Sequence, residues 1–322
     1  MVFIMAGHAN YLVYGSPSKI DILTSPYLTS FRIFAYQLGV VAVNCFVFIS
    51  GWFAINSNFK KGGNLIIQSL EYGLGLSILF MLLKYPVPKE QLVRMFFIGE
   101  YYWFIIAYLQ LYILAPVLNQ FSENASPKLF KSVIASFLIF EFFYGWIGGV
   151  GNYADGYSGI HFVGLYLLAR YIKKYIEFDK ITLPKSLTLY VAPVIVSFAI
   201  IILGGDFSEK WAYTTMRYMQ AYNSPFIILS SIGLFFVFYN MCFSSKWINW
   251  MSTSVLAIYL IHMNKSFFEY VFTPLIIYCG SNILLVSVVI LTICLFCILV
   301  DKLKCLIEQS ILRLFNYNKN RL

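Results

Sequence analysis

The chain has 322 residues, of which 60% are hydrophobic and only 11% are charged, and its formal charge is +9. Soluble globular domains carry about a quarter charged residues, so this composition excludes an ordinary soluble protein and indicates an integral membrane protein. The basic residues lie in short connectors between apolar runs, which fits the positive-inside bias of membrane proteins and argues against a nucleic-acid partner.

Apolar runs near twenty residues long indicate transmembrane helices, because that length crosses about 30 Å of hydrocarbon. We therefore predict an all-α polytopic bundle of about ten transmembrane helices, the first of them incomplete. One transmembrane domain is expected over residues 1–304, followed by a basic tail over residues 305–322. In chain order, the predicted spans are a partial one at 1–14 and full ones at 37–55, 65–83, 101–118, 132–150, 159–172, 187–204, 225–243, 251–271 and 283–300.

The orientation of the chain follows from its Lys and Arg residues, which divide fifteen to eight between alternate connectors. The richer side is cytoplasmic by the positive-inside rule. The C-terminus and the basic tail are then expected inside, and the partial first span runs from inside to outside. We expect a multi-pass protein of a bacterial cell envelope, placed in the lipid bilayer of the inner (plasma) membrane.

All three histidines of the chain, His8, His161 and His262, fall inside apolar runs. Ionisable groups within a membrane are costly unless they are paired or hydrated, and imidazole is suited to proton transfer near neutral pH. At about 1.5 Å per residue, His161 and His262 lie about 14 Å and 24 Å from the inner boundary. The three imidazoles are thus expected to meet at or above the midplane; the alternative for each is a bond to a neighbouring helix's backbone.

Two glutamates, Glu71 and Glu141, also fall inside apolar runs. Either can hold an imidazole tautomer or bond a Tyr or Trp across helices, and the second interpretation is favoured.

Three segments resemble, in the same order, segments of the membrane-bound acyltransferase family 3. A Ser-Gly pair and an aromatic residue end the second helix ahead of a basic loop, a Trp leads the fourth helix, and a late helix ends in Tyr-Leu-Ile-His. These segments are FVFISGWFAINSNFKK (46–61), YYWFIIAYLQLYILAPVLN (101–119) and WMSTSVLAIYLIHMN (250–264). The resemblance implies an integral enzyme that moves an acyl group, usually acetyl, from cytosolic acyl-CoA to a hydroxyl of a surface glycan or its lipid-linked precursor.

The first helix of that family carries an Arg, ten intervening residues and a His. The His maps onto His8 within AGHANY, whereas the Arg would fall four residues before Met1. An N-terminally truncated first helix is therefore expected.

The resemblance assigns roles to several residues. His8 is the candidate general base or transient acyl carrier, and His262 a second base, an orienting group or an oxyanion donor. Acyl-CoA is expected as co-substrate, with no bound cofactor or metal. The supporting or orienting candidates are Ser50, Gly51, Trp103, Glu141 and His161, and the candidates for binding acyl-CoA are Lys60, Lys61, Arg170, Lys173 and Lys174.

Structural interpretations stay open for most of these residues. Ser50 and Gly51 also suit close helix packing, Trp103 also suits an interfacial anchor, and the five cations also fit ordinary positive-inside topology. The segment Gly148 to Gly159 is either a connector or a lip on which a sugar stacks. A flippase or transporter of lipid-linked glycans, or a polysaccharide polymerase, is the alternative function.

Overall fold

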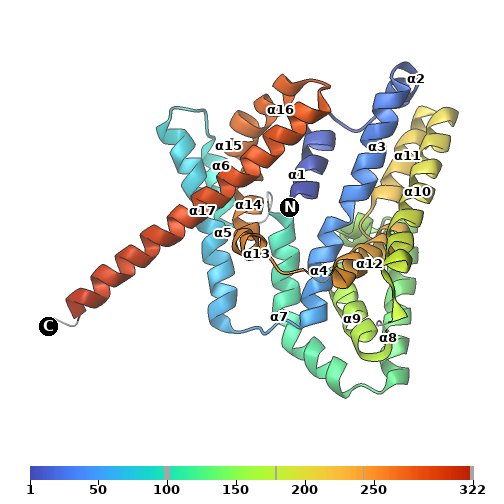
Figure 1. The fold of residues 1–322 in the computed structure, drawn as a ribbon, viewed down its shortest axis with the longest axis horizontal. Helices are drawn as coiled ribbons and strands as arrows, with labels where there is room; N and C mark the ends of the chain where they lie inside the picture. The colour runs from blue at the N-terminus through green and yellow to red at the C-terminus, as the bar shows by residue number, and fades with distance from the viewer. Residues whose placement is uncertain (98–101, 178–179, 242, 320–322) are drawn as a thin grey trace. The chain divides into compact units, whose positions relative to one another are not determined.

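The computed structural model describes residues 1–97, 102–177, 180–241 and 243–319. Those residues form helices and connectors, with no β-strand among them (Figure 1). Seven helical segments are long and apolar enough to cross a membrane, which confirms the predicted all-α polytopic fold. They are Pro26–Phe53, Phe59–Leu82, Trp103–Asn124, Pro127–Ile147, Leu183–Gly205, Glu209–Asn240 and Ile283–Ser310, and Val2–Val13 is a shorter apolar helix. The count of ten spans and the inside C-terminus stay predictions.

Two compact units make up the chain: a first unit of Met1–Met5, Gln68–Tyr101 and Phe243–Leu322, and a second unit of Ala6–Ile67 and Tyr102–Cys242. Helices α1 (Val2–Gly7) and α5 (Phe59–Leu82) contribute to both. The first unit holds α6 (Lys89–Phe96), α13 (Lys246–Ser252), α14 (Val255–His262), α15 (Lys265–Phe267), η5 (Phe268–Phe272), α16 (Thr273–Cys279) and α17 (Ile283–Lys319). The second holds η1 (His8–Val13), α2 (Lys19–Thr24), α3 (Pro26–Val40), α4 (Ala42–Phe53), α7 (Trp103–Asn124), α8 (Pro127–Phe140), η2 (Glu141–Ile147), η3 (Gly151–Gly156), α9 (Gly159–Tyr175), α10 (Leu183–Phe207), α11 (Glu209–Gln220) and α12 (Pro225–Asn240).

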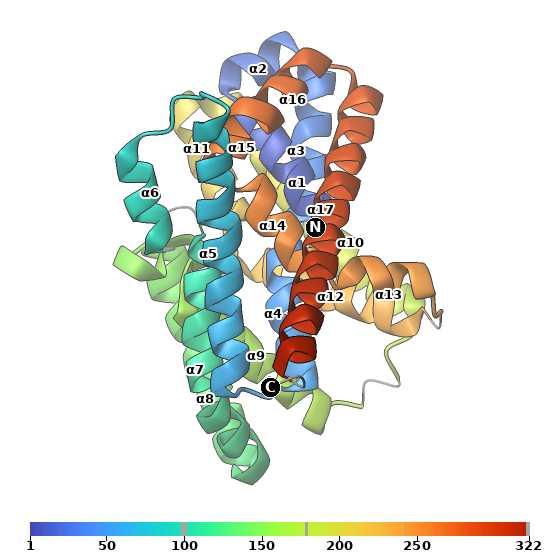
Figure 2. The same cartoon turned by 90° about the vertical axis from the view of Figure 1, so that its left-hand side faces the viewer.

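In the first unit, α14 and α16 pack beside the long helix α17 (Figure 2). The prediction of one continuous span over 251–271 is wrong, because this stretch is divided among α13, α14, α15 and η5. The break after His262 has a local cause. The Asn264 side chain accepts hydrogen bonds from the backbone N–H groups of Ser266 and Phe267 and so begins a new helix.

Helix α17 runs on past the expected boundary between residues 304 and 305. The last three residues of the expected basic tail, 320–322, lie outside the described residues, as does Tyr101, the expected first residue of one span. Within the apolar part of α17, the buried Asp301 accepts a hydrogen bond from the Tyr72 hydroxyl at 2.7 Å. This neutral donor offsets part of the cost of burying a carboxyl group there.

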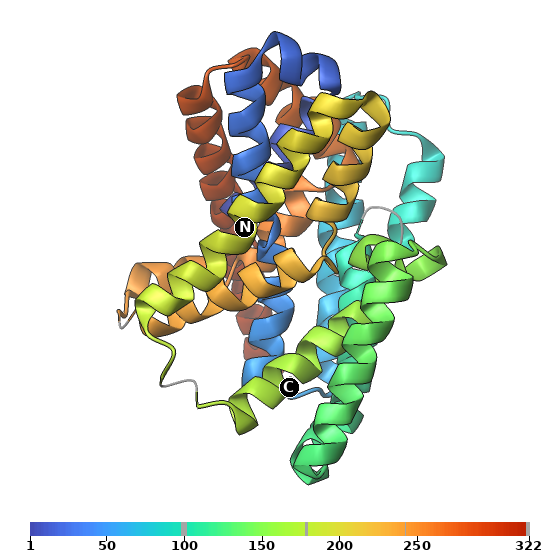
Figure 3. The same cartoon turned by 90° about the vertical axis from the view of Figure 1, so that its right-hand side faces the viewer.

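Proline and serine mark the helix starts in the second unit. Proline lies in the first turn of α3, α8, α10 and α12, where its missing N–H costs nothing. Ser126, Ser158 and Ser208 each accept a hydrogen bond from the third N–H of the following helix, in α8, α9 and α11. Helix α9 follows α8 and packs along it (Figure 3).

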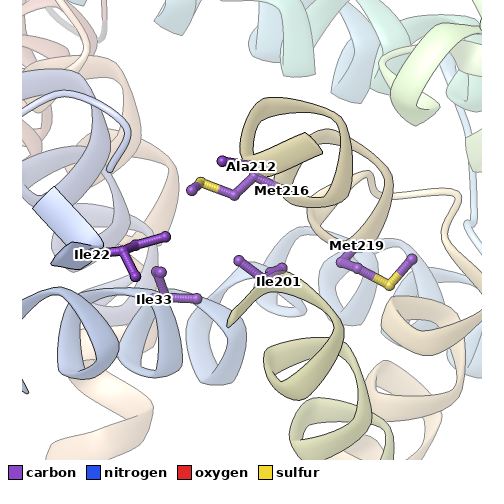
Figure 4. Close-up of a cluster of buried hydrophobic side chains, with 6 residues drawn as sticks. All are labelled: Ile22, Ile33, Ile201, Ala212, Met216 and Met219. Atoms are coloured by element: carbon purple, nitrogen blue, oxygen red, sulfur yellow. The ribbon is translucent and has the colours of Figure 1, made fainter. Parts of the chain in front are cut away.

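The second unit contains a buried apolar cluster that joins α2, α3, α10 and α11. Figure 4 shows the residues of this cluster on these elements. Helix α11 occupies most of the stretch between the predicted spans at 187–204 and 225–243, because its apolar face is buried in this cluster. The cluster consists of Ile22, Ile33, Ile201, Ala212, Met216 and Met219.

Candidate active site

The segment that carries His8 is held in the second unit by hydrogen bonds and ring stacking. A π-helix begins at His8, and the imidazole is partly buried. Arg32 on α3 donates from Nε to Asn10 Oδ1 and from Nη2 to the Asn10 carbonyl, both at 2.8 Å. The ring of Tyr11 stacks on Tyr36 with centroids 3.9 Å apart. These contacts fix the turn that presents His8, and π-helical turns are frequent at functional sites.

The same segment reaches the connection between α11 and α12. Gln220 Nε2 donates to the Tyr11 hydroxyl at 2.7 Å. Two residues later, the carbonyl of Tyr222 accepts a hydrogen bond from Asn44 Nδ2 at 2.8 Å. The His8 segment and Asn44, near the start of α4, are therefore tied to one short connection.

Asn44 leads to a buried pair of ionisable groups. His161 Nε2 lies 3.2 Å from Asn44 Oδ1, and His161 Nδ1 lies 3.5 Å from Glu141 Oε2. Both side chains are at most 2% exposed. The prediction that Glu141 bonds a Tyr or Trp is wrong, because its carboxyl group faces this imidazole and neither of its oxygens accepts a hydrogen bond from the described residues.

Trp103 begins α7 and belongs to an aromatic cluster beside this pair. Its ring centroid lies 4.5 Å from that of Tyr157 and 5.7 Å from that of Tyr222. Tyr157 closes the triangle, 4.9 Å from Tyr222, and is 52% exposed. Tyr157 directly follows η3, which forms within the segment from Gly148 to Gly159.

Ser50 and Gly51 lie where α4 packs against α7 and α9. The Ser50 hydroxyl donates to the Phe46 carbonyl at 2.9 Å and lies 3.2 Å from the Tyr108 hydroxyl. A Cβ atom on Gly51 would lie 2.6 Å from the backbone oxygen of Tyr166, so only glycine fits this approach of α4 and α9 without displacement. Neither Ser50 nor Gly51 is part of the pair formed by Glu141 and His161.

A cavity of about 420 Å³ opens at the C-terminal end of α4, lined by polar and apolar groups. Its wall is fixed by Tyr166, whose hydroxyl accepts from the Ile55 N–H and donates to Asn119 Oδ1. The lining residues are Phe53, Ala54, Ile55, Asn56, Ser57, Pro116 and Asn119.

Lys173 and Lys174, two of the five candidate cations, hold helix ends. Lys173 Nζ donates to the carbonyl of Trp52 at 2.8 Å, at the end of α4. Lys174 Nζ donates to the carbonyls of Ser122 and Glu123 at 2.8 and 2.9 Å, at the end of α7. Such contacts satisfy the last carbonyls of a helix and give both lysines a structural role.

The other three cations make fewer or longer contacts with the protein than Lys173 and Lys174 do. Lys60 is exposed, and Lys61 Nζ makes a long contact of 3.4 Å with the carbonyl of Asn56 in the cavity wall. Arg170 is 17% exposed; its Nη2 lies 4.0 Å from Glu123 Oε1, and its buried Nε has no hydrogen-bond partner. Lys60, Lys61 and Arg170 are thus the cations with hydrogen-bonding capacity to offer a ligand.

His262 belongs to the first unit, where it is fully buried at the end of α14. Its Nδ1 lies 2.6 Å from the carbonyl of Ile258. A carbonyl only accepts, so Nδ1 carries the proton and Nε2 is the basic atom of the neutral ring. The meeting of three imidazoles stays a prediction, because His8 and His161 belong to the second unit.

Glu71 also lies in the first unit and does not act as either sequence interpretation expected. Its carboxylate pairs with Lys304 at 2.5 Å and is 41% exposed. A lysine four residues before Glu308 on α17 supplies the counter-charge. The prediction that Glu71 bonds a Tyr or Trp is wrong, because its carboxylate forms an ion pair with the ammonium group of Lys304.

Sequence reasoning missed the neutral amides. Asn10, Asn44 and Asn119 organise the contacts described above, although none of them carries a charge that would mark it as a site residue. Their presence in apolar runs was the available signal, because amides within a membrane bond across helices. Within the described ranges, no group of three or more His, Cys, Asp and Glu side chains is placed to hold a metal ion.

Comparisons with known proteins identify the family. No curated protein and no solved structure matches the chain. A family profile described as an acyltransferase domain matches residues 1–301, nearly the whole chain. This match supports an enzyme that transfers acyl groups, rather than the flippase or the polymerase considered as alternatives. The chain therefore belongs to the membrane-bound acyltransferase family 3.

Proposed function

We propose that this protein is an O-acyltransferase of the plasma membrane that transfers an acyl group, acetyl in the simplest case, from cytosolic acyl-CoA to a hydroxyl of a cell-surface glycan or its lipid-linked precursor. One observation carries this proposal beyond the family. Helices α4 and α9 pack together, with the His161 pair at one end and the cavity and Arg170 at the other. His161 and Arg170 are nine residues apart on α9, or about 14 Å.

The two ends suit two substrates. Phosphate groups of acyl-CoA would meet Lys60, Lys61 and Arg170 at the end that positive-inside topology assigns to the cytosol. A glycan would approach the opposite end, where Trp103 and the exposed Tyr157 offer aromatic faces to a sugar ring. His8 belongs to that end because its segment and Asn44 meet at the connection between α11 and α12.

The reaction needs a base, because a thioester is already activated and a hydroxyl is a weak nucleophile. His8 takes the proton as the acceptor oxygen attacks the acyl carbon. The bond from carbon to sulfur breaks, and the CoA thiolate takes up the proton from the His8 imidazolium, which restores the neutral base. His262 serves as a second base or an orienting group, and Nε2 is the basic nitrogen of its neutral ring.

The test measures labelled acetyl moving from acetyl-CoA into glycan in membranes that contain the protein. His8→Ala is expected to abolish transfer, whereas Leu12→Ala, an exposed change in the same π-helix, is expected to preserve it. If His8→Ala transferred as much acetyl as Leu12→Ala, His8 would not be the base of the reaction. Failure of the wild-type protein to transfer acetyl or longer acyl groups would contradict the proposed function.

The donor end is tested separately through the Michaelis constant for acyl-CoA. Lys61→Ala and Arg170→Ala are expected to raise it, because each removes a positive charge beside the cavity. Lys131→Ala is the matched control, an exposed lysine on α8. If all three changes raised the Michaelis constant equally, acyl-CoA binding would depend on the overall charge of the protein and not on these two residues.

A further inference from the structure

A chain of buried polar groups joins α4, η2 and α9 to the residue that links α11 and α12. It runs from Glu141 through His161 and Asn44 to the carbonyl of Tyr222. The side chains of Asn44 and His161 are fully buried, and Glu141 is 1% exposed. These polar side chains are therefore shielded from solvent.

The Asn44 amide fixes the protonation of one imidazole nitrogen. Asn44 Nδ2 donates to the carbonyl of Tyr222, which can only accept. Asn44 Oδ1 is therefore the atom that faces His161 Nε2 at 3.2 Å. Because Oδ1 is an acceptor, Nε2 carries a hydrogen and donates it.

The other nitrogen of the ring faces a carboxyl oxygen. A neutral ring protonated at Nε2 presents a lone pair at Nδ1, and an ionised Glu141 would present a second lone pair 3.5 Å away. Neither Nδ1 nor Glu141 Oε2 has a hydrogen-bond partner in the part of the chain that the structure describes. Two facing lone pairs repel, so one proton lies between them, on the ring or on the carboxyl group.

We propose that Glu141 and His161 are a positioning pair that shares one proton, and that this proton holds the aromatic cluster of Trp103, Tyr157 and Tyr222 in place for the acceptor glycan. The inference rests on the proposed function and deepens its acceptor side. The pair acts through Asn44 and Tyr222 and does not touch the substrate.

Neighbouring contacts carry the effect to the cluster. The backbone N–H of Tyr222 donates to the carbonyl of Asp155 at 2.9 Å, so Tyr222 is held on both sides. Gly156 lies against the ring of His161, where a Cβ atom would be 3.2 Å from Cδ2. Two other ionisable side chains lie on the segment beside this cluster: Asp155, whose carboxylate is 3.2 Å from Arg217 Nε, and Tyr157, whose ring packs against Tyr222.

Two substitutions of Glu141 separate the shared proton from mere packing. In Glu141→Gln, the amide N–H donates to Nδ1 permanently and cannot be removed by base. In Glu141→Ala, nothing occupies that place. We expect Glu141→Ala to lower kcat/KM for the acceptor by about tenfold or more, mainly through KM, as one buried group loses its partner. We expect Glu141→Gln to stay within about twofold of wild type.

The recovery of activity by the conservative variant, and the share of the loss that falls on KM rather than on kcat, are the readouts that a merely structural role would not give. Glu177→Ala, at a carboxylate that is 72% exposed, is the control and should keep the wild-type kcat/KM. Wild-type behaviour of Glu141→Ala, equal damage by both Glu141 variants, or a loss confined to kcat would each overturn the proposal.

A measurement without acyl transfer keeps this proposal separate from the proposed function. The emission of Trp103 is taken as the difference between the protein and its Trp103→Phe variant in detergent. It is expected to be the same in Glu141→Gln as in the otherwise unchanged protein, and to differ in Glu141→Ala, where the cluster loses its support. If the unchanged protein transfers no acyl group but this difference in emission is seen, the proposed function fails and the pair stands. Equal emission in the unchanged protein and in Glu141→Ala overturns the pair.

Discussion

Gly51→Ala tests the close approach of α4 and α9. The added Cβ would lie 2.6 Å from the Tyr166 oxygen and 2.9 Å from both the Tyr166 Cα and the Ala169 Cβ. Two of these atoms are backbone, so relief requires the helices to move apart. Overpacking of this kind costs about 1–3 kcal/mol, and backbone contacts favour the upper end.

Helix propensity works in the opposite direction, because alanine is favoured over glycine within a helix by about 1 kcal/mol. The net loss expected for Gly51→Ala is therefore about 2 kcal/mol, or about 4 °C in apparent melting temperature in detergent. Gly63→Ala is the matched control: this glycine lies in α5 with nothing within 4 Å of the added atom. It is expected to stabilise the protein by up to about 1 kcal/mol.

The assay is thermal unfolding in detergent for both variants, followed by acetyl transfer in membranes. Because the cavity wall follows directly after α4, Gly51→Ala is also expected to raise the Michaelis constant for acyl-CoA. If Gly51→Ala were as stable as Gly63→Ala, the helices would not approach as described. The reasoning about this glycine would then be refuted.

Three further changes test other contacts. Arg32→Lys keeps the charge but loses the fork that holds the His8 segment, so acetyl transfer should fall by about tenfold in the membrane assay. Asp301→Leu should lower the melting temperature, whereas Asp301→Asn should keep an acceptor for Tyr72 and have little effect. Hydrogen bonds from the Ser18 N–H and hydroxyl hold the pKa of Asp21 below its usual range, so the stability that they contribute is present above about pH 4 and is lost as pH falls through the lower folded pKa. Ser18→Ala should therefore be less stable at neutral pH by about 1 kcal/mol, and thermal unfolding should show the difference from wild type narrowing in acid.

The helical character of the chain could be predicted from sequence because each membrane-crossing run must satisfy its own backbone hydrogen bonds. The run that begins near Trp103 illustrates this, since the helix begins at that residue. The break after His262 could not be predicted in the same way. It depends on Asn264, whose amide also donates to the carbonyl of Gly73, far away in the sequence.

The candidate site was partly predictable for a similar reason. Ionisable residues in apolar runs stand out, so His161 and Glu141 could be selected individually. The contact between these two side chains could not be predicted, because a sequence does not show which helices are neighbours. The same limit hid the role of Lys173, whose charge suggested a ligand while its ammonium group holds the carbonyl of Trp52.

The π-helical turns at His8–Val13 and Glu141–Ile147 have a consequence for comparing this chain with its relatives. Such a turn accommodates one more residue than an α-helical turn, and each residue in an α-helix advances the direction of the side chains by about 100°. A relative with one residue fewer in either stretch would keep both helix ends in place while losing only the bulge. Sequence alignments of this family should therefore permit single-residue gaps there. In a relative, the residue equivalent to His8 is better identified by the neighbouring equivalents of Asn10 and Tyr11 than by its position in the sequence.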